Sequence, residues 1–419
     1  LYLDRLAEVG YRNFYYGKWH AGPGTAHDHH CQGFSYPHYG NPYVTSEYQD
    51  YLARTGIPEA RFRIERQFRP EAWNQAFPEG KAYPPEESWF GGKVAGLTET
   101  PKESHEAFFL ADLACEKLRE LAASADQGPF SLRVDFWGPH HPHFPTREFA
   151  ELYDPETIPE YGSFRDDLSD KPDFWRWDYN DLISEDQELI LPSPLPWSEW
   201  QKVLARCYAH ITMIDAAGGQ ILDVLEETGL AENTLVVWTA DHGDAIACHG
   251  GHFGKGWYMP EEMVRIPMAL RFPGRIPAGQ VSDELVSNVD LVPTLIDAAG
   301  TGLGHEMDGQ SLLRLGSGET EDWREDLMCE THGFVEPHVG RLLVTDRYKY
   351  VFNEGAKDEL YDLERDPYEL VNLADDPQHS DVLSDMKTRL SEWMRRTDDT
   401  ASLPSEYVTF LRSLGRRSE

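Results

Sequence analysis

Apolar and polar positions alternate along this chain with two different spacings. Residues 107–123, 198–228 and 289–300 place apolar side chains three and four positions apart, which is the period of a helix with one buried face. Residues 234–238 ("TLVVW") and 266–274 are short apolar runs that are typical of buried strands. Helices that alternate with strands predict an α/β fold, in which a mainly parallel central sheet is sandwiched by helices.

Sequence signals mark the start of one predicted helix and the end of another. Ser198 followed by Gln201 forms a capping-box pattern and predicts that the long helix begins at Ser198. The chain opens with "LYLDRLAEVG", which is typical of the end of an amphipathic helix, and then with "YRNFYY", which predicts a strand. It has no initiator Met and no signal peptide, so we expect an N-terminal segment to be missing.

The pattern changes near residue 316. "GRLLVTDRYKYVF" and "DELYDL" predict antiparallel strands, and residues 381–397 predict a terminal helix. We therefore expect a catalytic α/β domain over residues 1–315 and a smaller α+β subdomain over residues 316–419. Residues 40–100 and 146–197 are rich in Pro, aromatic and acidic residues, which indicates long excursions over the edge where ligands bind.

Charge and apolar run length exclude several classes of partner. The chain has 73 acidic and 38 basic residues and a formal net charge of −35, which argues against nucleic acid and anionic membranes as partners. No apolar run is long enough to predict a membrane span. The five cysteines are scattered and none forms a C-x-x-C pair, so their spacing indicates neither a zinc site nor a disulfide framework.

Polar clusters follow three of the predicted strands. In open α/β sheets the carboxyl ends of the strands meet at one crevice, where ligands bind. Taken singly, each residue is more often structural than catalytic. Together they provide two cations, neutral imidazoles and a carboxylate, a set suited to holding a tetrahedral anion beside a metal ion. The residues are Lys18 and His20 in "GKWH", His140 in "GPHHPH", Asp241 and His242 in "TADHGD", and Lys255 in "FGKG".

The chain resembles the sulfatase family of the alkaline-phosphatase-like superfamily. The resemblance rests on "GYRNFYYGKWHAG", "GPHHPHFP", "TADHGD" with "HGGHFGKG", "EEMVRIPMALRFPG" and "DRYKYVFNEGAKDELYDLERDPYELVNLA", which occur in the family's order across the whole chain. It implies an α/β sandwich with a smaller C-terminal domain, which agrees with the alternation of helices and strands. It also implies a periplasmic or secreted location.

The resemblance also implies a role for each polar residue. Lys18 and His20 match residues that contact the sulfate and the nucleophile, and His140 matches the residue that assists the leaving oxygen. Lys255 matches a lysine that grips the sulfate, and Asp241 and His242 match the second pair of calcium ligands. Because an imidazole is softer than Ca²⁺ prefers, Mn²⁺, Mg²⁺ or Zn²⁺ could take its place.

One departure concerns the nucleophile. The family uses a formylglycine made from a Cys or Ser in a C-x-P-x-R-type motif, and none of the five cysteines here heads that motif. The family's first pair of aspartate ligands is also missing. We expect both features, including the formylglycine, in the missing N-terminal segment.

The predicted reaction is hydrolysis of a sulfate ester on a small molecule or an oligosaccharide, and a sulfated carbohydrate is the substrate class that we favour. A phosphodiester or phosphonate monoester hydrolase of the same superfamily is one alternative, and a non-catalytic binder of sulfated glycans is another. The aromatic excursions could stack on sugar rings, although packing is the interpretation that we favour for their tryptophans. These are Trp175, Trp177, Trp197 and Trp257.

Overall fold

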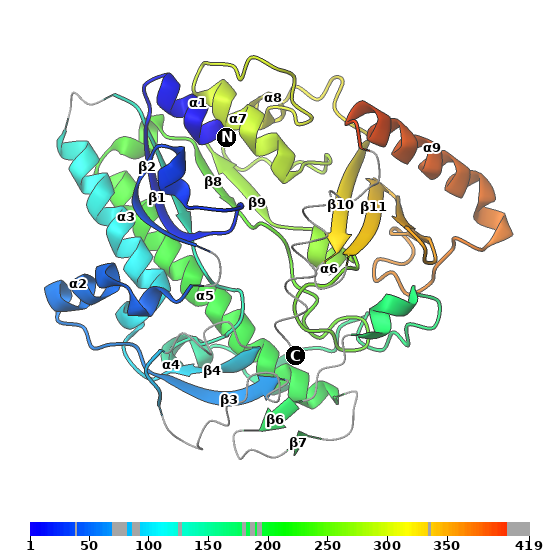
Figure 1. The fold of residues 1–419 in the computed structure, drawn as a ribbon, viewed down its shortest axis with the longest axis horizontal. Coiled ribbons are helices and arrows are strands. Elements are labelled where there is room, and N and C mark those ends of the chain that lie inside the picture. The colour runs from blue at the N-terminus through cyan, green and yellow to red at the C-terminus, as the bar shows by residue number, and fades with distance from the viewer. Residues whose placement is uncertain are drawn as a thin grey trace.

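The computed structural model describes residues 1–37, 40–68, 82–85, 93–124, 128–177, 182–184, 189–190, 195–333 and 337–399. Figure 1 shows two groups of elements: layered helices and strands from the first three quarters of the chain, and a smaller C-terminal sheet with one long helix. In the part of the chain that is described, no helix is both long and apolar enough to cross a membrane.

A parallel sheet forms the first layer. Its central strand is β1 (Arg12–Trp19), which pairs in parallel with β2 (Cys31–Pro37) on one side and with β5 (Phe130–Asp135) on the other. Side chains of β1 alternate between two buried faces, as expected for the centre of a parallel sheet. Tyr15 packs with residues of α1 (Tyr2–Glu8), whereas Phe14 packs toward α3 (Glu106–Ala123).

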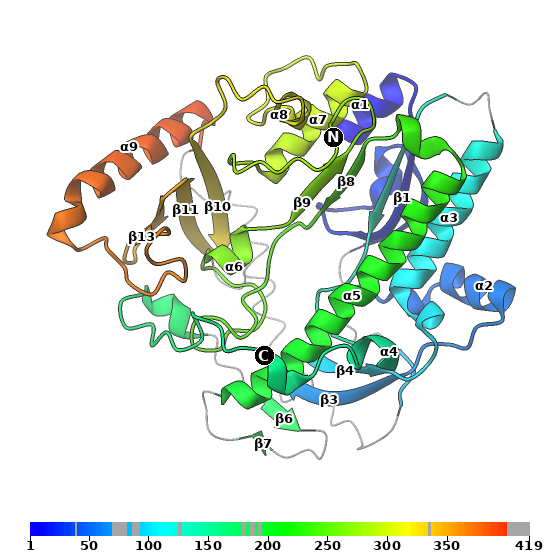
Figure 2. The same cartoon turned by 180° about the vertical axis from the view of Figure 1, so that it is seen from behind.

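Two long helices cover one face of this sheet. Helices α3 and α5 (Trp197–Glu227) run side by side in front of β1 in Figure 2. Small residues allow them to approach closely, because Ala107 and Ala111 of α3 share a cluster with Ala209 and Ala217 of α5. The predicted capping box was wrong, since α5 begins at Trp197 with Pro196 as its N-cap.

Tertiary contacts explain that earlier start. Trp197 Nε1 and Gln201 Nε2, one helical turn apart, both donate to the carbonyl oxygen of Ile158, at 3.2 and 2.8 Å. The ring of Trp197 also packs edge-on against Tyr161 and Phe164. These contacts hold Trp197 in the first turn of α5, so Ser198 lies inside the helix and does not cap it.

Further strands form two other sheets. Strand β8 (Val236–Thr239) pairs antiparallel with β9 (Met268–Arg271). The predicted excursions contain a four-stranded antiparallel sheet in the order β4-β3-β6-β7, drawn at the bottom of Figure 1. Its strands are β3 (Phe62–Phe68), β4 (Val94–Thr98), β6 (Leu182–Ser184) and β7 (Leu189–Ile190). This part of the chain also has shorter helices: α2 (Ser46–Thr55), α4 (Arg147–Ala150), α6 (Glu261–Val264), α7 (Leu291–Ala298) and α8 (Leu312–Gly316).

The C-terminal part is a meander of four antiparallel strands covered by one helix, which confirms the predicted α+β character. Its strands are β10 (Asp326–Gly333), β11 (Pro337–Thr345), β12 (Tyr348–Asn353) and β13 (Glu359–Asp362). Helix α9 (Ser380–Arg396) packs Met386, Leu390 and Trp393 against this sheet. The boundary that we place at residue 316 stays a prediction.

Candidate active site

Lys18 lies near the end of β1, where β1 and β5 approach each other closely. A Cβ atom at Gly17, whose φ is +126°, would lie 2.0 Å from the carbonyl oxygen of Asp135, so only glycine fits there. The Tyr15 hydroxyl lies 2.5 Å from Asp135 Oδ2 and 2.6 Å from the carbonyl oxygen of Lys18. These contacts fix the backbone of Lys18 beside the carboxyl end of β5.

Charged groups from four segments surround the Lys18 ammonium. Burial lowers the pKa of Lys18 to about 8, and the positive charge of Lys255 acts in the same direction. Asp241, Asp135 and Glu106 act in the opposite direction, in that order of size. The structure therefore brings Lys18, Lys255 and Asp241 within electrostatic reach of one another.

His140 lies in the turn that follows β5. Its Nδ1 lies 2.7 Å from the carbonyl oxygen of His141, which can only accept a hydrogen bond, so Nδ1 carries the proton in the neutral ring. Burial, reinforced by the positive charges of Lys18 and Lys255, lowers the pKa of His140 to about 3. His140 is therefore a neutral imidazole with Nε2 as its acceptor.

Asp241 and His242 follow β8 and offer two ligand atoms to one point. His242 Nδ1 lies 2.6 Å from the carbonyl oxygen of Gly243, which makes Nε2 the acceptor nitrogen. That Nε2 lies 3.5 Å from Asp241 Oδ2, the separation of two neighbouring ligands on one cation. Lys255 Nζ lies 2.8 Å from the same Nε2, so the lysine ammonium contacts the Asp241–His242 pair. The donor set fits part of a divalent metal site.

The charge on Asp241 agrees with that role. Desolvation opposes ionisation of this carboxyl group, but His242 and Lys255 outweigh it and lower the pKa of Asp241. Burial lowers the pKa of Lys255, against the opposing charges of Asp241 and Asp244. Asp241 is thus an anion within electrostatic reach of two lysines, and an anionic carboxylate is what a metal ligand requires.

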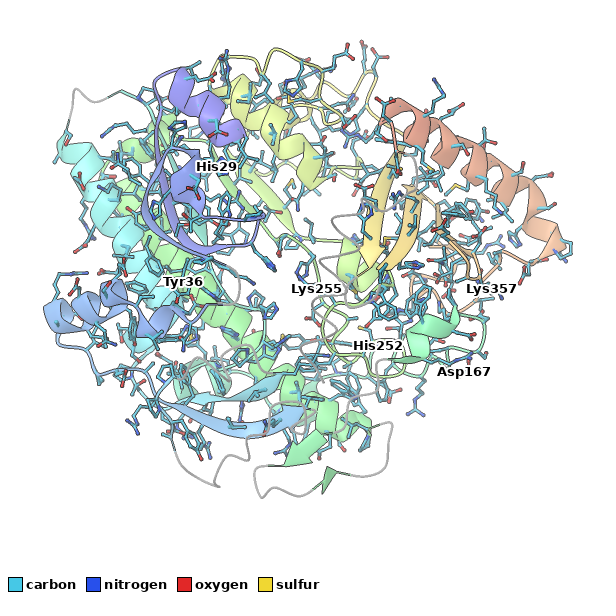
Figure 3. The ribbon with its side chains drawn as sticks, in the orientation of Figure 1. His29, Tyr36, Asp167, His252, Lys255 and Lys357 are labelled. Carbon is cyan, nitrogen blue, oxygen red and sulfur yellow. The ribbon has the colours of Figure 1, made fainter. Side chains whose placement is uncertain are left out.

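A compact loop presents Lys255. The carboxylate of Asp244 accepts hydrogen bonds from the backbone N–H groups of Ile246 and Gly254, at 2.9 and 3.0 Å. Ala247 N donates to the carbonyl oxygen of His252 at 2.8 Å, which closes the loop further. Figure 3 labels His252 and Lys255 on this loop, in the middle of the view between the N-terminal layers and the C-terminal sheet.

Five of the six predicted site residues form one group. Lys18, His140 and Lys255 interact electrostatically, and Lys255 joins them to Asp241 and His242. His20 follows the end of β1 and is exposed to solvent.

Two charged residues near this group were not predicted. Glu106, at the start of α3, accepts a hydrogen bond at Oε1 from Gly138 N at 3.3 Å, and burial raises its pKa to about 7. Lys93 Nζ donates to the carbonyl oxygen of Phe253 at 2.7 Å. Neither carries a sequence signal, because a glutamate in the first turn of a helix is common and "GGKVAG" matches no motif.

Three of the four tryptophans named for the excursions pack against other aromatic rings. Trp175 is 2% exposed and stacks on Tyr258, with ring centroids 4.7 Å apart. Trp197 packs at the start of α5, and Trp257 lies edge-on to Phe174. The side chain of Trp177 lies outside the described residues. All five cysteines are free thiols.

Comparisons with known proteins extend the resemblance. A family model described as "Sulfatase" matches residues 3–301, and one described as "N-sulphoglucosamine sulphohydrolase, C-terminal" matches residues 249–396. A choline-sulfatase of Rhizobium meliloti is 29% identical over 301 residues, which are 69% of this chain and 54% of that protein. An N-acetylglucosamine-6-O-sulfatase of Bacteroides thetaiotaomicron is 28% identical over 275 residues, which are 63% of this chain and 48% of that protein. The chain spans about half the length of the curated relatives it matches.

Solved structures share the fold. A phosphonate monoester hydrolase from Silicibacter pomeroyi superposes with a TM-score of 0.70 at 20% identity, covering 97% of this chain and 82% of the other. A protein solved with its substrate D-glucosamine-2-N,6-O-disulfate gives a TM-score of 0.63 at 18% identity, covering 95% and 82%. The family match over residues 3–301 covers most of the chain, and the fold agrees with it. The protein therefore belongs to the sulfatase family, within the alkaline-phosphatase-like superfamily.

Proposed function

We propose that this protein takes part in the hydrolysis of a sulfate ester. The proposal rests on one observation: Lys18 and Lys255 lie within electrostatic reach of each other and close to the Asp241–His242 pair. Two cations and a partial metal site at one strand-end edge can hold the oxygens of a tetrahedral anion. Family membership supports sulfate as that anion.

Each side chain has a proposed task. Lys18 and Lys255 bind sulfate oxygens, and Asp241 and His242 hold a divalent cation, with Ca²⁺ as the first candidate. Once bound, such a cation supplies positive charge that polarises the sulfate and lowers the pKa of an attacking hydroxyl group. The family's nucleophile is a formylglycine, and none of the five cysteines of this sequence heads its motif. We therefore place the nucleophile outside these 419 residues.

The histidines have proposed tasks in proton transfer. His140 is neutral while Lys18 and Lys255 face it without an anion. A sulfate ester bound between the lysines would offset their charge and raise the pKa of His140, so that Nε2 can take up a proton from solvent and pass it to the departing oxygen. His20, at the end of the strand that carries Lys18, is proposed to help release the sulfate.

A sulfated carbohydrate is the proposed substrate. Two similar proteins, one an N-acetylglucosamine-6-O-sulfatase and one solved with a disulfated glucosamine, support this class. The net charge of −35 would repel a polyanion, except where the lysines and the cation create a local positive potential. We place the enzyme in the periplasm or outside the cell, as the family resemblance implies.

Phosphonate monoester hydrolysis is the second candidate, because a hydrolase of that activity shares the fold with a TM-score of 0.70. The test compares kcat/KM for an aryl sulfate and an aryl phosphonate monoester, using protein that includes the formylglycine-bearing part. We expect the sulfate to be the better substrate and chelation to abolish its turnover. A better phosphonate substrate would favour the second candidate. Binding of sulfated glycans without turnover of either ester would identify a binder.

A further inference from the structure

A second group of ligand-type side chains lies buried between α3, α5 and the turn after β5. His105 and Glu106 begin α3, His210 lies on α5 and His143 lies in the turn. One ligand atom each from His105, Glu106 and His210 can be chosen so that all lie within 4.8 Å of one another. The ring centroids of His143 and His210 are 6.1 Å apart. His143 therefore adds a third imidazole next to these three residues.

Several polar atoms of this group have no partner among the described residues. They are Glu106 Oε2 and both ring nitrogens of His210 and of His143. Glu106, His143 and His210 are each 2% exposed and His105 is 3% exposed, so bulk water does not reach them. Buried polar groups are normally hydrogen-bonded, because leaving them unpaired costs free energy. So many unpartnered polar atoms in one buried cluster indicate a bound group.

The chemistry of the donors selects that group. Two or three imidazoles and one carboxylate are the ligands of a borderline cation, and Zn²⁺ takes such nitrogen and oxygen donors in tetrahedral sites. Ca²⁺ and Mg²⁺ prefer sites made of oxygen alone, which this cluster does not offer. We propose that His105, Glu106 and His210 form a structural Zn²⁺ site, with His143 or a water molecule at the fourth position.

Small movements complete the coordination. His105 Nδ1 lies 4.0 Å from Glu106 Oε1, and its lone pair faces Ala107 N at 3.2 Å. That contact lies at the long end for a hydrogen bond, so Nδ1 exchanges it for the cation. Glu106 Oε2 and the His210 nitrogens need to break no contact to bind.

The site is separate from Asp241 and His242 but lies under the turn that carries His140. Glu106 Oε1 accepts from Gly138 N, and a Cβ atom added to Gly138 would lie 2.6 Å from His210 Nε2. A cation held by Glu106 and His210 would therefore tie α3 and α5 to Gly138, two residues before His140. This consequence for catalysis rests on the proposed function, whereas the site itself does not.

The experiment first removes the metal site proposed at Asp241 and His242. The parent protein carries Asp241→Asn and His242→Ala, is stripped with a chelator, is dialysed against Zn²⁺ and is analysed for bound zinc. We expect one equivalent of zinc, and with Co²⁺ in its place an absorption band typical of tetrahedral coordination. His210→Phe added to this parent should remove both signals, because phenylalanine fills the same space without ligand atoms.

Two controls separate loss of the site from loss of the fold. His252→Phe changes another buried histidine outside the cluster and should leave the zinc content unchanged. In chelator, His210→Phe should melt no lower than the parent, since it removes unpaired polar atoms. Zn²⁺ should then raise the melting temperature of the parent and leave that of His210→Phe unchanged. A zinc-free parent, or equal zinc in parent and His210→Phe, would overturn the proposal.

Discussion

At the scale of single residues, Lys255 and the proposed cation use the same atom. Lys255 Nζ lies 2.8 Å from His242 Nε2, and that nitrogen is the proposed metal ligand. A lone pair cannot accept from an ammonium and bind a metal ion at once. Binding of the cation would therefore release Lys255 from His242 and leave its ammonium to face the sulfate.

Lys255 is predicted to matter for rate more than for stability. Lys255→Ala removes one of the two cations proposed to hold sulfate as charge develops. It should therefore lower kcat/KM by about a hundredfold or more, by analogy with the loss of one preorganised donor. The melting temperature should change little, because the half-buried side chain makes no ion pair with a carboxylate among the described residues.

The measurement uses an aryl sulfate and protein with an installed formylglycine. Lys357→Ala is the matched control, because Lys357 pairs at the surface with Asp375 at 3.1 Å, far along the chain from the site. It should keep the parent's kcat/KM. If Lys255→Ala turned over sulfate as fast as the parent, the role proposed for the two lysines would be wrong.

At the scale of elements, the contact between α5 and β8 leaves no free space at one glycine. Adjacent residues of α5 differ sharply in this respect. A Cβ atom at Gly218 would lie 2.5 Å from Cζ3 of Trp238, which belongs to β8, whereas a Cβ at Gly219 would meet nothing within 4 Å. Gly218 therefore sets how closely the helix approaches the strand that leads to Asp241.

These two glycines predict opposite effects of one substitution. Gly219→Ala should stabilise the protein by about 0.5–1 kcal/mol, because alanine favours the helix. Gly218→Ala has the same helical gain but must displace the Trp238 ring, at a cost of about 1–3 kcal/mol. The free energy of unfolding, measured in urea, should therefore be lower for Gly218→Ala than for Gly219→Ala by about 1 kcal/mol or more. Equal stabilities would show that Trp238 moves freely and that the contact is loose.

At the scale of the whole molecule, buried ionic groups join segments that are distant in sequence. Lys349 of β12 is fully buried and pairs with Glu369 at 2.7 Å and with Glu261 of α6 at 3.2 Å. His249, in the loop that presents Lys255, is also fully buried and lies between Asp166 and Glu262, at 2.9 and 3.3 Å. Lys349 links the C-terminal sheet to α6, and His249 links the Lys255 loop to the segment around Asp166.

His249 should make the stability depend on pH. Burial tends to lower its pKa, but Asp166 and Glu262 outweigh burial and raise the pKa of His249 above 6.5. The charged histidine therefore stabilises the fold fully below about pH 6.5, and this contribution is lost as the pH rises through the folded-state pKa. His249→Gln should cost about 3 kcal/mol at pH 6, the order expected for a broken buried pair, and less at pH 9.

Urea unfolding at both pH values measures this difference. His379→Gln is the control, because His379 forms a partly exposed pair with Asp376 at 2.9 Å and should cost less than about 1 kcal/mol. A cost for His249→Gln that does not change between pH 6 and pH 9 would mean that the histidine is neutral in the folded protein.

Much of the fold could be predicted because its signals are local. Predicted helices at residues 107–123, 289–300 and 381–397 correspond to α3, α7 and α9, with small differences at their ends. The start of α5 was misplaced because contacts with Ile158, from another segment, extend the helix past its sequence signal. The sheet formed by β3, β4, β6 and β7 was not predicted, since residues 40–100 and 146–197 show little periodicity.

The sequence by itself determined where strands end and which polar side chains follow them. It placed Lys18, His140 and Asp241 at strand ends, because the apolar period records which face of each element is buried. Only the tertiary structure decided which of these side chains meet. Lys255 bonds to His242, and His105, Glu106, His143 and His210 converge from three segments. Such contacts depend on how whole elements pack, and a pattern that repeats every few residues carries no record of that packing.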